Sequence, residues 1–175
     1  MSDQRAVQTR HKIINTFLTL LTTKSVLSIS VSELSTMTNI NRGTFYLHYK
    51  DIFDLYNQVM EMVLLDLKND LDRTYPRGSE IDFKTLTEHV INYINKEQAF
   101  FLTLLRSENG ATFIEKIKRV FIEKVYASNN TADMVDVIYN VNGIIGVLIF
   151  WQTDSDDIST KEITDRLTTI LETIE

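Results

Sequence analysis

Apolar residues recur along most of this chain at intervals of three or four positions, the spacing of one face of an α-helix. Near the N-terminus, one such stripe predicts a helix from about residue 4 to 22; its members are Val7, Ile14, Phe17, Leu18 and Leu21. The period-two alternation that is typical of strands is almost absent. Only one proline and five glycines interrupt the 175 residues. We therefore expect an all-α fold.

A capping box marks the start of the next helix. Ser30 and Glu33 have the spacing at which a serine hydroxyl accepts a hydrogen bond from the backbone N–H of residue 33 and the glutamate reaches back to the cap. The pair predicts a short helix from Val31 to about Thr38. The preceding residues, 22–30, are interpreted as a short polar connection.

A tight turn and a third helix follow. Asparagine tolerates left-handed backbone geometry and caps helices, so Asn39-Ile40-Asn41 predicts a turn in which Asn41 begins a helix from Arg42 to about His48. Two short helices joined by a three-residue turn are typical of a helix-turn-helix. In that motif the second helix enters the major groove of DNA.

A long fourth helix is expected after the motif, with Asp51 as its cap and residues 52–72 as its extent. After a break at residues 75–79, further helices are expected near 81–95, 96–106, 111–128, 131–152 and 159–174. The prediction is a three-helix head (residues 1–50) joined by the long helix to a helical bundle, the body (residues 51–175), with about nine helices in all.

The net charge of the chain also changes sign at the boundary between head and body, after residue 50. The whole protein has a net charge of −6, which by itself argues against nucleic-acid binding. Residues 1–50, however, hold six Lys/Arg and two Asp/Glu, whereas residues 51–175 hold 12 and 22. A head of +4 on a body of −10 favours a polyanion-binding head.

Composition excludes several classes of function. The absence of cysteine excludes disulfides, thiolate metal sites and catalytic thiols, and the three histidines are scattered. No metal, cofactor or catalytic residue is expected.

The polar N-terminus lacks a signal-peptide core, and the unbroken apolar run Gly143–Trp151 is too short to span a bilayer. We expect a cytoplasmic protein with no membrane partner.

Helical spacing sorts the third helix into two faces. Phe45 and Tyr49 lie four residues apart and are expected in the core. The candidate contacts to DNA lie elsewhere and are Ser32, Arg42, Gly43, Thr44, Tyr46, His48 and Lys50. Hydroxyl and ammonium groups suit phosphates, and the threonine methyl suits a thymine methyl. His48 can equally cap the helix, and the basic residues of the first helix (Arg5, Arg10 and Lys12) can be a solvated face or touch phosphate.

These residues resemble the TetR family of bacterial transcriptional regulators. The most specific part is the run Gly43-Thr44-Phe45-Tyr46-Leu47-His48-Tyr49, and the similarity covers about residues 9–60. It implies DNA binding by the third helix and an effector-responsive body. Asn39 stands where the family usually has glycine, and Ile52 where it usually has a lysine, whose phosphate contact Lys50 can take over.

The C-terminal part resembles short Gram-positive members of the same family, through Val141–Gly146, Phe150 and Trp151. The resemblance implies a dimer interface of two helices from each subunit. Its candidate residues are Gly143, Ile144, Gly146, Trp151 and Leu167; packing within one subunit is the alternative for the two glycines. A ligand pocket is also implied, with His89, Tyr93, Phe101 and Tyr139 as candidates, although such residues at helical spacing are more often core.

The expected function is that of a DNA-binding transcriptional regulator, a repressor that binds a palindromic operator as a homodimer. A small molecule or a protein partner would release or modulate it. The alternative is an all-helical protein-interaction module that does not bind DNA. A third hypothesis, an all-helical enzyme, is weak, because the sequence shows no nucleophile elbow, phosphate loop or metal-ligand pair.

Overall fold

The computed structural model describes residues 2–76, 78–79, 81–96, 98–128, 133–154 and 157–174. Within these residues the chain forms nine α-helices, one 3-10 helix and no strand, which confirms the all-α prediction. The elements are α1 (Ser2–Leu21), η1 (Val26–Ser28), α2 (Val31–Thr38), α3 (Arg42–Tyr46), α4 (Ile52–Thr74), α5 (Phe83–Lys96), α6 (Gln98–Leu105), α7 (Gly110–Ser128), α8 (Met134–Asp154) and α9 (Thr160–Ile174).

Two elements differ from expectation. The third helix ends at Tyr46 rather than near His48, because the backbone N–H of His48 bonds to the carbonyl of Phe45 only three residues back, which tightens the chain into a turn. The supposed polar connection contains η1, because Val26 and Ile29 are both buried. The start of the helix expected at 131–152 lies partly outside the described residues, and α8 begins at Met134.

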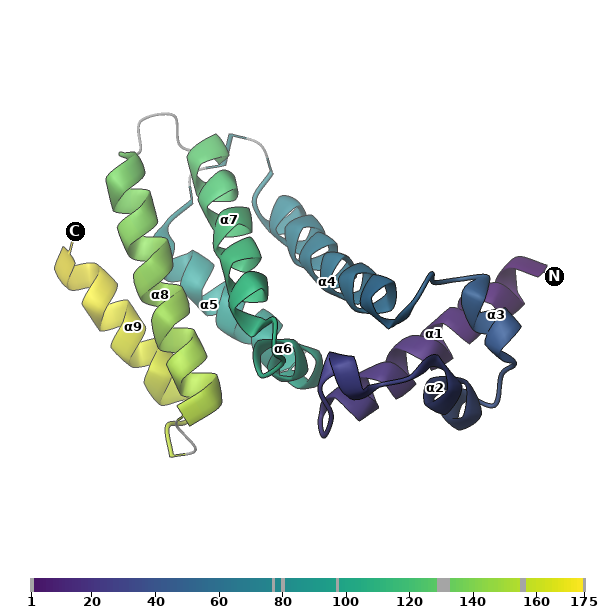
Figure 1. The fold of residues 1–175 in the computed structure, drawn as a ribbon. Coiled ribbons are helices and arrows are strands. Elements are labelled where there is room, and N and C mark those ends of the chain that lie inside the picture. Colours follow the sequence, from purple (N-terminus) through teal and green to yellow (C-terminus); the bar gives the residue numbers. More distant parts are fainter. Residues whose placement is uncertain are drawn as a thin grey trace.

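The head consists of α1, η1, α2 and α3 at the N-terminal end of the molecule (Figure 1). α1 packs on α2, and α2 packs on α3. Ile13, Phe17, Leu34 and Phe45 have no exposed surface. These four side chains come from all three α-helices of the head, so they fix the mutual orientation of those helices.

The body is a bundle of α4–α9 in which α5 packs on α9, α7 packs on α8, and α4 packs on α7 (Figure 1). By length and composition alone, α8 could cross a membrane, with a mean hydropathy of 1.7 over its most apolar window. In the fold its apolar residues at Val137, Val141, Ile144 and Leu148 are buried. One face of α8 therefore belongs to the core of the bundle.

α4 links the two parts. Its 23 residues give a length of roughly 35 Å at 1.5 Å per residue. Tyr56 on α4 packs edge-on against Phe17 of α1, with ring centroids 6.5 Å apart. The hydroxyl of Tyr56 lies 2.9 Å from Ser107 Oγ, just after α6. A movement of α4 or α6 would therefore reach the head directly.

Candidate DNA-binding site and effector cavity

The turn of the helix-turn-helix follows the predicted chemistry. Ser30 Oγ accepts a hydrogen bond from the N–H of Glu33 at 3.1 Å, which confirms the first of the two hydrogen bonds of the predicted capping box. Asn39 has φ 55° and ψ 47°, the left-handed geometry expected of it. Asn41 precedes α3 as its cap residue, without a side-chain cap bond. The carboxylate of Glu33 pairs with Lys24 instead of reaching back to the cap.

Two buried aromatic rings hold α3, the candidate recognition helix, in place. Phe45 is fully buried and Tyr49 is 2% exposed, with ring centroids 5.6 Å apart. Arg10 Nε donates to the Tyr49 hydroxyl at 3.3 Å, and its Nη2 donates to Gln58 Oε1 at 3.2 Å. Burial raises the pKa of Tyr49, so this hydroxyl stays neutral at ordinary pH. Arg10 thus joins α1, the end of the motif and α4, a role that the sequence did not indicate.

All seven predicted DNA contacts lie at the surface, and we call them the recognition surface. Thr44 and His48 are half-buried, Tyr46 is 50% exposed, and the other four are exposed: Ser32, Arg42, Gly43 and Lys50. A Cβ atom on Gly43 would meet nothing within 4 Å, so the space outside its backbone is open. Another surface can therefore approach α3 closely at this point.

Sequence reasoning missed one exposed residue of this region. Leu47 is 83% exposed, directly after α3. The available signal was its helical spacing, because Leu47 follows Gly43 by one turn and so shares its outward direction.

The start of α4 is fixed by two carboxylates. Asp51 Oδ1 accepts from the N–H of Asp54 at 2.8 Å, which confirms Asp51 as the cap. Asp54 Oδ2 accepts from the N–H of Lys50 at 2.9 Å and from Gln58 Nε2 at 3.0 Å. The bond from Lys50, followed by that from Gln58, lowers the pKa of Asp54. Ile52, where a lysine is usual, is 6% exposed and belongs to the core, whereas Lys50 is exposed.

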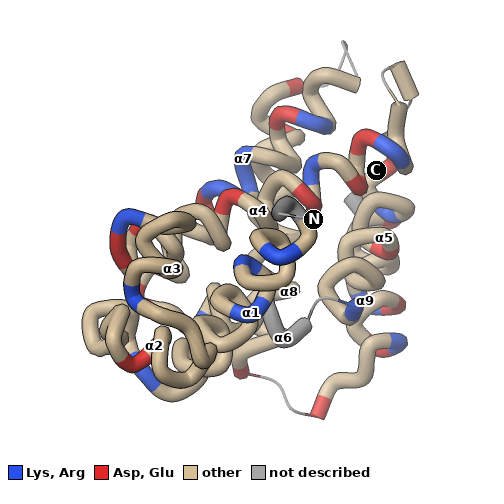
Figure 2. The backbone as a smooth tube through the Cα atoms, turned by 90° about the vertical axis from the view of Figure 1, so that its right-hand side faces the viewer, with Lys and Arg blue, Asp and Glu red and all other residues tan. Residues whose placement is uncertain are grey.

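The positive charge of the head lies partly on α1. Figure 2 views the molecule from the side of the head and shows Lys and Arg positions along this helix. Arg5, Arg10 and Lys12 are all exposed. Among the described residues, no group of three or more histidines or acidic residues could hold a metal ion.

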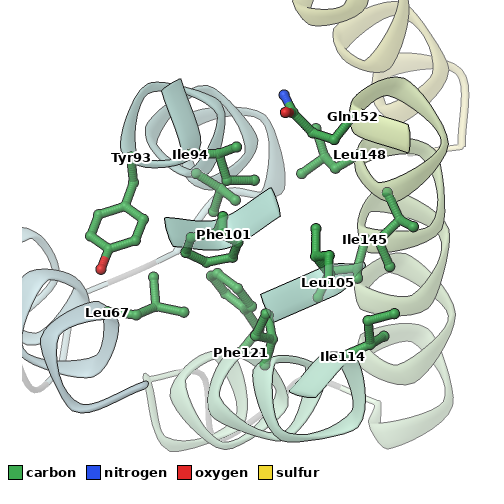
Figure 3. A pocket seen from close by; sticks show the side chains of 13 residues that line it. Leu67, Tyr93, Ile94, Phe101, Leu105, Ile114, Phe121, Ile145, Leu148 and Gln152 are labelled. Atoms are coloured by element: carbon green, nitrogen blue, oxygen red, sulfur yellow. The ribbon is translucent and has the colours of Figure 1, made fainter. Parts of the chain in front are cut away.

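The body contains an apolar cavity between α4, α5, α6, α7 and α8 (Figure 3). Its volume is about 30 Å³. Gln152 lies at its rim, and the other lining residues are apolar or aromatic: Leu67, Val90, Tyr93, Ile94, Phe101, Leu105, Ile114, Ile117, Phe121, Ile145, Leu148 and Ile149. Because pockets for drug-sized molecules measure about 300–1,000 Å³, such a ligand could enter only if the surrounding helices moved apart.

Two of the four predicted ligand residues line this cavity. Tyr93 and Phe101 form part of its wall, with ring centroids 5.9 Å apart. The Tyr93 hydroxyl points toward α4, as Figure 3 shows, and donates to Asp66 Oδ2 at 2.9 Å. His89 instead pairs with Asp70 at 2.6 Å, one turn later on α4 than Asp66 and one turn earlier on α5 than Tyr93. Tyr139 is 64% exposed on α8, outside the cavity.

The predicted dimer residues divide into two groups. Gly143 and Gly146 are exposed, and a Cβ atom on either would meet nothing within 4 Å. Ile144, Trp151 and Leu167 are buried within the subunit. The indole of Trp151 donates to the carbonyl of Ile158 at 2.7 Å and so fastens the α8–α9 connection. Ile144 and Trp151 on α8, together with Leu167 on α9, belong to the core of the bundle.

Comparison with known proteins identifies the family. A family model for the C-terminal region of transcriptional regulators of the TetR type matches residues 82–173, more than half of the chain. The regulator AcrR of Shigella flexneri is 34% identical over 59 residues. That match covers 34% of this chain and 27% of AcrR, so the chain spans about a quarter of this relative.

Solved structures share the fold along nearly the whole chain. A transcriptional regulator from Aquifex aeolicus VF5 is 20% identical with a TM-score of 0.73, covering 95% of this chain and 99% of its own. A TetR regulator from Streptococcus agalactiae 2603V is 18% identical with a TM-score of 0.68, covering 97% of each chain. NalD from Pseudomonas aeruginosa is 16% identical with a TM-score of 0.72, covering 96% of each chain.

Members of the TetR family are DNA-binding regulators and not enzymes. With a matching C-terminal region, a shared fold and an intact helix-turn-helix, this chain belongs to the TetR family of transcriptional regulators.

Proposed function

We propose that this protein is a homodimeric transcriptional repressor that binds a palindromic operator in the cytoplasm and is released or modulated by a small molecule or a protein partner. The observation that carries the proposal is the recognition surface. Polar side chains and an open glycine surround a short helix whose buried rings, Phe45 and Tyr49, hold it rigidly. Such a surface suits the phosphates and base edges of a major groove.

The exposed face of α8 supports the homodimer. From Met134 to Thr153, Asp136 is the only charged residue. Large apolar side chains remain exposed along this helix, including Val135 at 71%, Tyr139 at 64% and Phe150 at 51%. An exposed apolar surface of this kind is typical of a protein interface. Gly143 and Gly146 would allow the α8 helices of two subunits to approach closely.

A dimer also suits the size of the DNA site. One recognition helix contacts only a few base pairs, whereas a two-fold dimer contacts two half-sites about 34–36 Å apart. The proposed interface lies on the body, so both heads stay open to DNA. Repression needs only occupancy of the operator. Among proteins of similar fold, NalD is named as a repressor of a multidrug efflux pump and DhaS as an operon activator. The fold by itself is therefore compatible with both repression and activation.

The cavity provides a route from an effector to the head. A ligand that entered it would displace the rings of Tyr93 and Phe101, because the cavity of about 30 Å³ holds little more than one water molecule. Tyr93 is bonded to Asp66 on α4, and α4 carries the head. The shift would change the spacing of the two recognition helices. An effector acts this way only if it binds one arrangement more tightly than the other.

Fluorescence anisotropy with random-sequence duplex DNA tests the proposal, on protein whose mass is measured by light scattering. We expect a dimer that binds with a log affinity falling linearly with log salt concentration, since each neutralised phosphate releases counterions. Thr44→Ala and Tyr46→Ala should weaken binding while the protein still unfolds cooperatively.

Tyr126→Ala is the matched control, because Tyr126 is 48% exposed on α7 and Tyr46 is 50% exposed on α3. If the control weakens binding as much as Tyr46→Ala does, the recognition surface is misplaced. If the wild-type protein binds no duplex even at low salt, the interaction-module alternative replaces the proposal.

A further inference from the structure

The side chain of Leu47 is more exposed than any other large apolar side chain that the structure describes, at 83%. It lies on the positively charged head, among polar neighbours. A leucine in this position loses the favourable free energy of burial, which is about 1.5–3 kcal/mol for such a side chain. This exposure is unexplained by the packing of the subunit.

The backbone around Leu47 fixes its outward direction. Its N–H bonds to the carbonyl of Gly43 at 3.2 Å, so the two residues are stacked one helical turn apart. Phe45 and Tyr49, two residues to either side, are buried. Because these rings anchor the segment on both sides, Leu47 cannot turn inward without breaking the core of the head.

Gly43 and Tyr46 place Leu47 inside the recognition surface. Apart from its chain neighbours and the backbone of its own helix, nothing lies within 4 Å of the Cβ position at Gly43, so DNA can approach the backbone there. Tyr46 is 50% exposed and leans edge-on against Phe45, with centroids 5.6 Å apart. A surface that approaches Gly43 would therefore also cover Leu47.

We propose that Leu47 contacts the C5-methyl group of a thymine and thereby specifies that base in each half-site. This inference rests on the proposed function. Leucine has no hydrogen-bond donor for a phosphate or a polar base edge. On the major-groove edges of the four bases, the thymine methyl is the apolar group. The contact would bury both apolar groups and favour thymine over cytosine at that position.

Uracil provides a direct test, because it pairs as thymine does but lacks the methyl group. A duplex would first be selected from a random pool with the wild-type protein. Each thymine of the selected site would then be replaced singly by deoxyuridine. Burial of one methyl group changes affinity about fourfold. We expect one thymine per half-site to show this loss, and replacement in both half-sites to give about fifteenfold.

Leu47→Ala should bind the selected duplex more weakly and should bind the thymine and uracil duplexes equally. Leu27→Ala is the matched control. Leu27 is 73% exposed on η1. The residue before it, Val26, lines a cavity together with Arg106 and Ser107 of the body, so this part of the head lies next to the body. The control should keep the fourfold preference for thymine. Light scattering should give the same mass for all three proteins.

The inference is overturned if no thymine shows the loss in the wild-type protein, or if the loss persists in Leu47→Ala. It is also overturned if Leu47→Ala lowers the mass, because Leu47 would then contact a second copy of the chain. Failure to select any duplex would instead overturn the proposed function, and the inference with it.

Discussion

The head and the body differ in net charge and in the kind of side chain that they expose. The head buries a few rings and presents polar groups around one short helix, with a net charge of +4 over residues 1–50. The body, with a net charge of −10, exposes an apolar face on α8 and encloses a small apolar cavity. In the head, most of the candidate DNA contacts are polar while the core is apolar and aromatic, with Tyr46 and Leu47 as the exceptions. In the body, the same apolar types serve the core, the cavity and the proposed interface.

The largest expected effect concerns the interface. Gly146→Arg would place a long charged side chain on the exposed apolar face of α8, where Asp136 is the only other charge from Met134 to Thr153, and should separate the dimer. Loss of the second head should reduce operator affinity about 10²–10⁴-fold, because the second contact would no longer be intramolecular. Sedimentation and anisotropy on a selected duplex measure both effects. Ala127→Arg, an exposed position on α7, is the control and should change neither. A dimeric, fully active Gly146→Arg protein would place the interface elsewhere.

A second comparison uses one substitution in both regions. A Cβ atom on Gly110, at the start of α7, would lie 2.0 Å from the carbonyl oxygen of Leu105. Gly110→Ala must therefore displace the end of α6, at an expected cost of about 1–3 kcal/mol in the free energy of unfolding. Gly43→Ala in the head meets no neighbour and should leave that free energy unchanged or raise it by about 0.5–1 kcal/mol. Urea denaturation measures both; equal effects would contradict the crowding at Gly110.

The link between the cavity and α4 should have a smaller effect. Tyr93→Phe keeps the ring in the cavity wall but removes the hydroxyl that donates to Asp66. Because Asp66 is exposed to solvent, we expect a loss of about 0.5–1.5 kcal/mol in the free energy of unfolding. Tyr126→Phe on α7 should have no effect. If both variants unfold like the wild type, the hydroxyl contributes nothing to the attachment of α4.

The smallest expected effect is a pH dependence at the start of α4. Hydrogen bonds from Lys50 and Gln58 lower the pKa of Asp54 in the folded state. Its carboxylate therefore stabilises the fold above the unfolded pKa of about 3.9, and this stabilisation is lost as the pH falls through the lowered folded value. Asp54→Asn should flatten the acid side of the stability profile. Asp82→Asn should do the same directly before α5, where a hydrogen bond from Thr85 lowers the pKa of Asp82. A profile unchanged in both variants would contradict these assignments.

The sequence determined most of the local structure. Ser30, Asn39 and Asp51 each act within three residues of their own position, so their effect could be predicted from neighbours alone. Helical spacing separated Phe45 and Tyr49 from the recognition surface for the same reason. The bounds of the long helices also followed from their apolar stripes. The short element η1 did not, because only Val26 among its three residues is buried.

Only the tertiary structure decided which apolar residues of the body face a neighbour. Ile144, Trp151 and Leu167 are buried in the subunit while Tyr139 and Phe150 are exposed, although all five are suited to a core or an interface. His89 meets Asp70 across two helices, and Arg10 meets Tyr49 across 39 positions. Such contacts depend on how helices distant in sequence are placed in space. Helical periodicity tells which residues share a face, but the packing of the whole bundle determines what covers that face.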